Sequence, residues 1–161
     1  MSVISIETAI EHLRAEDDDR AFIQGLLDAA ELAAASFLQR NIYPDEESLL
    51  AARGTVALMR RAARARQSAG LELAGLIEDL DDRDAAVNDS EALLREDMEQ
   101  ADAIARGMVL NRAVQAACLL TLGHLYTNRE DVVAGSGTLT ALALPKGSRF
   151  LLDPYRVKMG V

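Results

Sequence analysis

Apolar residues recur at spacings of three and four along residues 20–40, which is the pattern of an amphipathic helix. The residues that form this stripe are Phe22, Ile23, Leu26, Leu27, Ala30, Ala34, Phe37 and Leu38. We expect Asn41 and Pro44 to end the helix, because proline cannot continue the ladder of backbone hydrogen bonds and disfavours helical geometry before it.

A shorter apolar stripe over residues 6–13 predicts a first helix, with Ser5 as its N-cap. The acidic run 16–19 lies between these two helices. Carboxylates are favourable beside a helix N-terminus, so we interpret the run as capping of the second helix rather than as a metal site.

The middle of the chain, residues 45–108, predicts additional helices. An acidic first turn at 45–47 begins a third helix that is expected to stop near Gly70. A short apolar piece over 71–80 follows, and the segment 88–90 is expected to cap another helix that ends near Gly107.

The last third begins with a segment, 111–127, that is apolar on nearly every face and predicts a central helix with Cys118 filling core volume. Glycines and an alternating apolar stretch then predict a loose β-hairpin or a projecting arm over 128–148. We expect a partner or a neighbouring subunit to order this arm, because compact domains seldom keep so long a loop without a use. Ser148 is expected to cap a last short turn.

The composition favours helices and excludes some classes of function. Alanine and leucine dominate while only 4% of the residues are aromatic, so we expect an all-α fold: one domain over 1–161, a small helical bundle with a C-terminal arm and a short terminal helix. The net charge of −9 argues against a protein that mainly neutralises DNA phosphates. A single cysteine is compatible with a reducing cytosol and excludes a zinc site built of cysteines. With no signal stretch and a longest apolar candidate of only 113–126, we expect a cytoplasmic protein without a membrane segment.

Several motifs occur in the order of a known family. The segments 5–14 (SIETAIEHLR) and 37–41 (FLQRN) resemble the first half of the head-tail connector, or adaptor, family of long-tailed bacteriophages. The second half resembles it more closely, at 113–117 (AVQAA), 124–130 (HLYTNRE), 132–135 (VVAG) and 151–156 (LLDPYR). The resemblance covers roughly residues 1–44 and 109–156, whereas 45–108 is longer than the family's connection there.

This resemblance implies a structural subunit without cofactor or metal. It would form a ring of about a dozen copies under the portal protein, receive a tail-side neck or tail-terminator protein, and let DNA pass without sequence-specific binding. Its place would be the neck of the virion, and the host cytoplasm before assembly. We expect contacts to neighbouring subunits or the portal from two groups of residues, one in the arm and one in the tail: Val132, Val133, Leu139, Leu142 and Leu144, and Arg149, Tyr155 and Arg156. Tyr126 and Arg129 are expected to anchor the root of the arm.

The only basic cluster lies in the middle segment, where Arg53, Arg60 and Arg64 fall near one helix face. It could contact DNA or an acidic partner, but we favour a solvated face that balances neighbouring acids, since no aromatic residues are interleaved with it.

Two other functions stay open. A magnesium-dependent nucleotide pyrophosphohydrolase needs acidic residues that converge from two helices. The sequence offers six candidates but no convincing paired motif: Glu78, Asp79, Asp82, Glu96, Asp97 and Glu99. A helix-turn-helix regulator needs an exposed polar recognition helix, whereas 111–127 is too apolar for that role. His12 and His124 are isolated and are expected to be structural.

Overall fold

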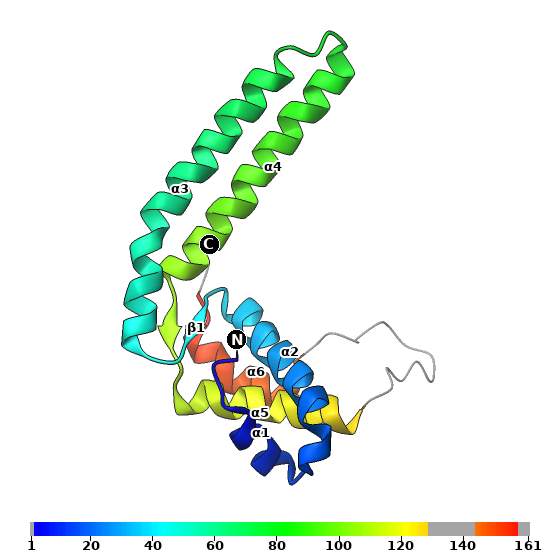
Figure 1. Cartoon of the computed structure of the whole chain (residues 1–161), viewed down its shortest axis with the longest axis vertical. Coiled ribbons are helices and arrows are strands. Elements are labelled where there is room, and N and C mark those ends of the chain that lie inside the picture. Colours follow the sequence, from blue (N-terminus) through cyan, green and yellow to red (C-terminus); the bar gives the residue numbers. More distant parts are fainter. Residues whose placement is uncertain (1, 129–143, 158–161) are drawn as a thin grey trace. The chain divides into compact units, whose positions relative to one another are not determined.

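The chain is an all-α protein, as its composition predicts. The computed structural model describes residues 2–128 and 144–157, and these residues form six α-helices and one small sheet (Figure 1). The chain divides into two compact units, Met1–Asp45 with Met108–Val161, and Glu46–Gly107. The first unit therefore combines the two ends of the chain.

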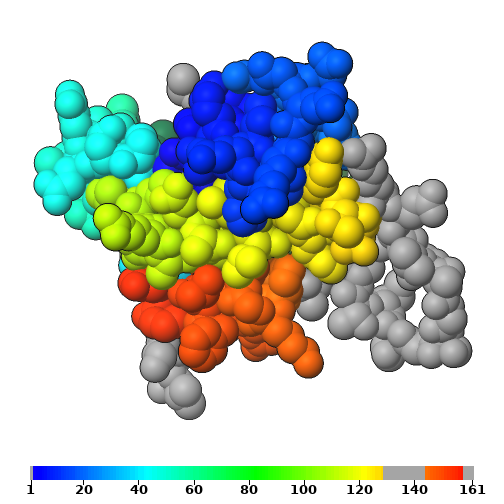
Figure 2. Space-filling view, turned by 90° about the horizontal axis from the view of Figure 1, so that it is seen from below, coloured from blue at the N-terminus to red at the C-terminus, as the bar shows by residue number. Residues whose placement is uncertain are grey.

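The first unit, which we call the terminal unit, contains four of these helices. They are α1 (Ile6–Leu13), α2 (Arg20–Leu38), α5 (Arg112–Thr127) and α6 (Lys146–Leu152). Short 3-10 turns precede α2 at Asp17–Asp19 and follow α6 at Asp153–Tyr155. Figure 2 shows α5, in yellow-green, lying between α1 in blue and α6 in orange.

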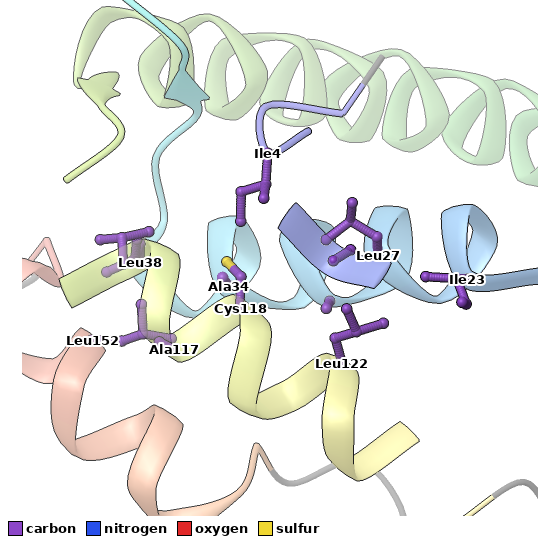
Figure 3. Packing of buried hydrophobic residues seen from close by; sticks show 12 residues of the cluster. Ile4, Ile23, Leu27, Ala34, Leu38, Ala117, Cys118, Leu122 and Leu152 are labelled. Atoms are coloured by element: carbon purple, nitrogen blue, oxygen red, sulfur yellow. The ribbon is translucent and has the colours of Figure 1, made fainter. Parts of the chain in front are cut away.

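The core of the terminal unit lies between α2 and α5, and α6 closes it (Figure 3). Its fully buried residues come mainly from those helices: Ile23, Leu27, Ala30, Ala34 and Leu38, then Val114, Ala117, Cys118 and Leu122, and finally Leu152. The prediction that Cys118 fills core volume is confirmed.

The first two helices form where the sequence predicts them. The hydroxyl of Ser5 accepts a hydrogen bond of 3.2 Å from the amide of Thr8, so the N-cap of α1 is confirmed. Asp19 takes the N-cap position of α2 without a side-chain capping bond, and its carboxylate instead accepts a hydrogen bond of 3.1 Å from the Tyr126 hydroxyl. The capping interpretation is therefore wrong for this side chain, because a tertiary contact to α5 takes its place.

Helix α2 ends before the residues that were expected to stop it. Gln39 adopts a left-handed conformation with φ of 56°, and the amide of Arg40 reaches back to the carbonyl of Ala35 at 3.3 Å. This is the geometry of a Schellman cap, which satisfies the last carbonyls of the helix. Asn41 and Pro44 consequently lie beyond the end of α2 and do not cause it.

A two-stranded sheet, absent from the sequence-based prediction, joins the points where the chain leaves and re-enters the terminal unit. Strand β1 (Ile42–Tyr43) pairs in parallel with β2 (Met108–Val109), and Ile42 lies opposite Met108. The amide of Leu110 donates to the carbonyl of Tyr43 at 2.8 Å. The sheet thus makes 46–107 an insertion at a single place in the terminal unit.

The second unit, which we call the hairpin, is a pair of long antiparallel helices, α3 (Glu46–Ala74) and α4 (Leu80–Ala105) (Figure 1). The prediction that the third helix stops near Gly70 is wrong. A Cβ at Gly70 would lie 2.5 Å from the Ser90 hydroxyl oxygen, so glycine serves a close approach of the helices and not a helix end.

Helix α4 begins earlier than expected. Its N-cap is Asp79, whose carboxylate accepts hydrogen bonds of 3.0 Å from the amides of Asp81 and Asp82. The predicted cap at 88–90 lies inside the helix, where the Ser90 hydroxyl donates to the carbonyl of Ala86. Residues 71–80 are therefore the tip of the hairpin rather than a separate piece.

One helical segment, Asp17–Leu38, is long and apolar enough to cross a membrane by length and composition alone. The expectation that 113–126 is the longest such candidate is thus wrong. Core helices of soluble proteins have the same composition, and this segment contributes Ile23, Leu27 and Leu38 to the core.

Candidate partner-binding site

Helix α6 is held to α5 by a buried polar contact. The hydroxyl of Ser148 is fully buried and hydrogen-bonds with that of Thr121 at 3.0 Å. Thr121 also bonds the carbonyl of Ala117, and Leu152 is fully buried in the core. Ser148 was expected to cap a short turn, which is wrong: α6 begins at Lys146, with Pro145 in the N-cap position.

The C-terminal segment presents two arginines to one aromatic ring of α2. The guanidinium carbon of Arg156 lies 5.0 Å from the centroid of the Phe37 ring, and that of Arg149 lies 5.9 Å away. Cation–π contacts at such distances favour a fixed orientation of both side chains. The backbone amide of Val157 also donates to the carbonyl of Leu38 at 3.1 Å, which secures the segment after α6.

An apolar groove of about 550 Å³ lies beside this aromatic ring, between α2 and the start of the α6 segment. We call it the α2–α6 groove, and its lining residues are Ala29, Leu32, Ala33, Ser36, Phe37, Leu144 and Arg149. A mostly apolar lining with a single cation suits an apolar peptide segment better than a small polar metabolite.

Three of the residues predicted for partner binding meet at this surface. Leu144 and Arg149 line the α2–α6 groove, and Arg156 shares the Phe37 ring with Arg149. Tyr155 is half-buried and packs against the core, so its contacts lie within the terminal unit. The other predicted residues, Val132, Val133, Leu139 and Leu142, lie outside the described residues, as do Arg129 and most of the 128–148 arm.

Two large apolar residues of the terminal unit that the sequence-based prediction did not single out are strongly exposed to solvent. Leu32 is 69% exposed on α2, and Phe150 is 80% exposed on α6. A signal for Leu32 was present, because it lies off the apolar stripe that predicted the helix.

The predicted basic face in α3 is largely occupied by contacts within the hairpin. Arg60 forms an ion pair with Asp102, and Arg53 donates to the carbonyl of Gly107 at 3.1 Å. Arg64 is exposed and makes no ion pair within the described residues.

Two of the acidic residues proposed for a magnesium site have separate structural roles in the hairpin. Asp79 caps α4, and Asp97 pairs with Arg66 at 2.8 Å. Over residues 2–128 and 144–157, no group of three or more His, Cys, Asp or Glu side chains is placed to hold a metal ion. The packing of α5 argues against 111–127 as a DNA-recognition helix, because α5 buries Val114, Cys118 and Leu122 in the core.

A carboxylate on α2 fixes the N-terminal segment. Glu31 accepts hydrogen bonds from the amides of Val3 and Ile4, at 2.9 and 2.8 Å, and from the hydroxyl of Ser2. The nearby Cys118 thiol is buried, and this burial, with a smaller contribution from the charge of Glu31, raises its pKa to about 12. The thiol is therefore unreactive near neutral pH.

Together these features define a class: an all-α protein with an inserted helical hairpin and an apolar surface groove. The chain matches no protein-family model, and neither curated proteins nor solved structures include a match to it.

Proposed function

We propose that the protein is a structural ring subunit of the head-tail connector type, which joins the portal of a phage capsid to the tail. It acts by binding rather than by catalysis, and it extends the channel through which DNA passes. Its partners are further copies of itself, the portal protein and a tail-side neck protein.

The observation that supports this proposal most directly is the division of the chain. The resemblance to connectors covers about 1–44 and 109–156, and one compact unit is made of Met1–Asp45 with Met108–Val161. The motifs that lie within the described residues therefore belong to one folded body, although the long segment 45–108 separates them along the chain. The departure from the family, 45–108, corresponds to the hairpin inserted between β1 and β2.

The α2–α6 groove is our candidate for the surface that receives a partner. Its apolar lining, with Leu32 69% exposed, is costly to leave in water and favours a contact that covers it. Leu144, a residue of the predicted arm, lines this groove. A ring requires that each subunit carry two different surfaces that bind each other. An arm and a groove would supply these two surfaces.

Deleting residues 134–143 tests the arm. We expect loss of ring formation or portal docking in gel filtration with the purified portal, with an unchanged helical circular dichroism spectrum. Unchanged docking by the deleted chain would contradict the assignment of the arm.

A single substitution tests the groove. Leu32→Asp should weaken portal docking or ring formation at least about tenfold, because it places a charge on an apolar contact surface. The matched control is Ala21→Asp, which changes an exposed residue of the same helix outside the groove. Equal behaviour of the two variants would exclude the groove as a contact surface.

A further inference from the structure

Helix α3 of the hairpin has two apolar faces, only one of which is covered. Its buried residues Leu49, Val56 and Ala63 recur every seven positions and pack against α4. Two positions after each of them comes another apolar residue, about 200° further around the helix. These second residues therefore point away from α4.

The uncovered face has the spacing of a coiled-coil seam. Its residues follow one another at alternating intervals of four and three, and all are exposed: Ala51, Thr55, Leu58, Ala62, Ala65 and Ala69. We call this set the outer seam. Leu58, at its centre, is 68% exposed. Such a pattern on a single helix predicts that another helix packs along it.

The two helices of the hairpin carry opposite charge. Between Ser48 and Leu71, α3 has five arginines and no acidic residue, whereas α4 has nine acidic residues and two arginines. Pairs between Arg60 and Asp102 and between Arg66 and Asp97 use part of this charge inside the hairpin.

The remaining charge faces outward on both helices. Arg61 is exposed beside the outer seam, and Arg64 is exposed one turn from it, on the side of the helix that carries Arg60; neither makes an ion pair within the described part of the chain. Arg61 lies within one turn of both Leu58 and Ala65. An unpaired basic edge beside an apolar seam favours an acidic helix as the partner.

Helix α4 offers such a partner surface. Leu93 is 62% exposed, and Asp89 and Glu96 lie within one turn of it on either side. With the exposed Ala85 they form what we call the Leu93 face, and no ion pair engages its two acids within the described residues.

We propose that the outer seam of one subunit packs against the Leu93 face of a second copy of this chain, with Arg61 and Arg64 opposite Asp89 and Glu96. A contact between two outer seams would instead bring arginines against arginines. The contact is therefore heterologous, and its repetition sets α3 and α4 of successive copies in an alternating row, which closes into a ring when the rotation per subunit allows. This deepens the proposed function, because both require self-association.

Reciprocal charge reversal tests the contact in the full chain. The variants are Arg61→Glu with Arg64→Glu, and Asp89→Lys with Glu96→Lys, studied by analytical ultracentrifugation without portal. Each variant alone should weaken self-association at least about tenfold, and an equimolar mixture should restore contacts between unlike chains. Matched controls in the terminal unit are Arg14→Glu with Arg112→Glu, and Glu11→Lys with Glu16→Lys, which should associate like the unaltered chain.

A second pair of variants tests the apolar part. Leu58→Glu should abolish self-association while the helical content stays constant, whereas Leu80→Glu, at an equally exposed leucine outside both surfaces, should not. The inference is overturned if the unaltered chain stays monomeric at high concentration, or if neither Leu58→Glu nor the charge variants weaken association. It is also overturned if the mixture fails to restore association. Portal docking, measured separately, tests the proposed function independently of these outcomes.

Discussion

The two units of the molecule bury very different side chains. The terminal unit encloses large residues such as Ile23, Leu27 and Leu122 without exposure, whereas the hairpin buries mainly alanines between its helices. The hairpin also leaves seven leucines exposed: Leu50, Leu58, Leu71, Leu73, Leu76, Leu80 and Leu93. Apolar burial is the main stabilising term in folding. The terminal unit therefore has a core of its own, whereas the exposed leucines of the hairpin favour binding to a partner.

The largest expected effect comes from a matched pair of leucines. Leu27→Ala should lower the free energy of unfolding by about 3–5 kcal/mol, because it leaves a cavity in the core of the terminal unit. Leu58→Ala in the hairpin should change it by less than about 0.5 kcal/mol in dilute solution, since Leu58 is exposed. Urea unfolding of both variants checks this, and equal losses would contradict the difference between the units.

A smaller effect is expected from the carboxylate that secures the N-terminal segment. Glu31→Ala removes the acceptor of the Val3 and Ile4 amides and should cost about 2 kcal/mol. Glu31→Gln keeps one acceptor oxygen and should cost less. If both variants unfold like the unaltered chain, the N-terminal segment contributes nothing to the terminal unit.

The core cysteine gives this unit a dependence on alkaline pH. Its pKa of about 12 exceeds that of an exposed thiol, so between about pH 9 and 12 only the unfolded chain releases the proton. Stability should therefore fall as the pH rises, by about 1.4 kcal/mol per pH unit from this group. Cys118→Ala should lack this part of the slope, and identical slopes in urea unfolding from pH 9 to 10.5 would refute the assignment.

The smallest expected effect on stability compares two glycines of α3, one with open space beside it and one close to α4. Gly54 has open space where a Cβ would be, so Gly54→Ala should stabilise the hairpin by about 1 kcal/mol through helix propensity. Gly70→Ala should give less or a loss, because its Cβ would meet Ser90. Hydrogen exchange of the hairpin amides measures both, and an equal gain would show that α3 and α4 do not approach closely at Gly70.

The sequence predicted the elements of the terminal unit well because its apolar stripes are strong and local. Ser5 capping and the central position of 111–127 follow from neighbouring residues alone. The errors arose where a tertiary contact decides the local structure. Asp19 binds Tyr126 instead of capping α2, Gly70 allows Ser90 to approach instead of ending α3, and Ser148 bonds Thr121 in the core.

The candidate site was less predictable for the same reason. Arg149 and Arg156 could be singled out from the tail, but their meeting over the Phe37 ring depends on how α6 packs on α5. Likewise, the outer seam is exposed because α4 covers the opposite face of α3, and that packing is a tertiary property. The pattern alone does not say which apolar face is buried.

Imaging the full chain mixed with a phage portal protein tests the connector proposal most directly. We expect a closed ring of copies bound to the portal, with hairpins of adjacent subunits in contact. A portal that stays bare in an excess of this protein, with the chain remaining monomeric, would contradict it.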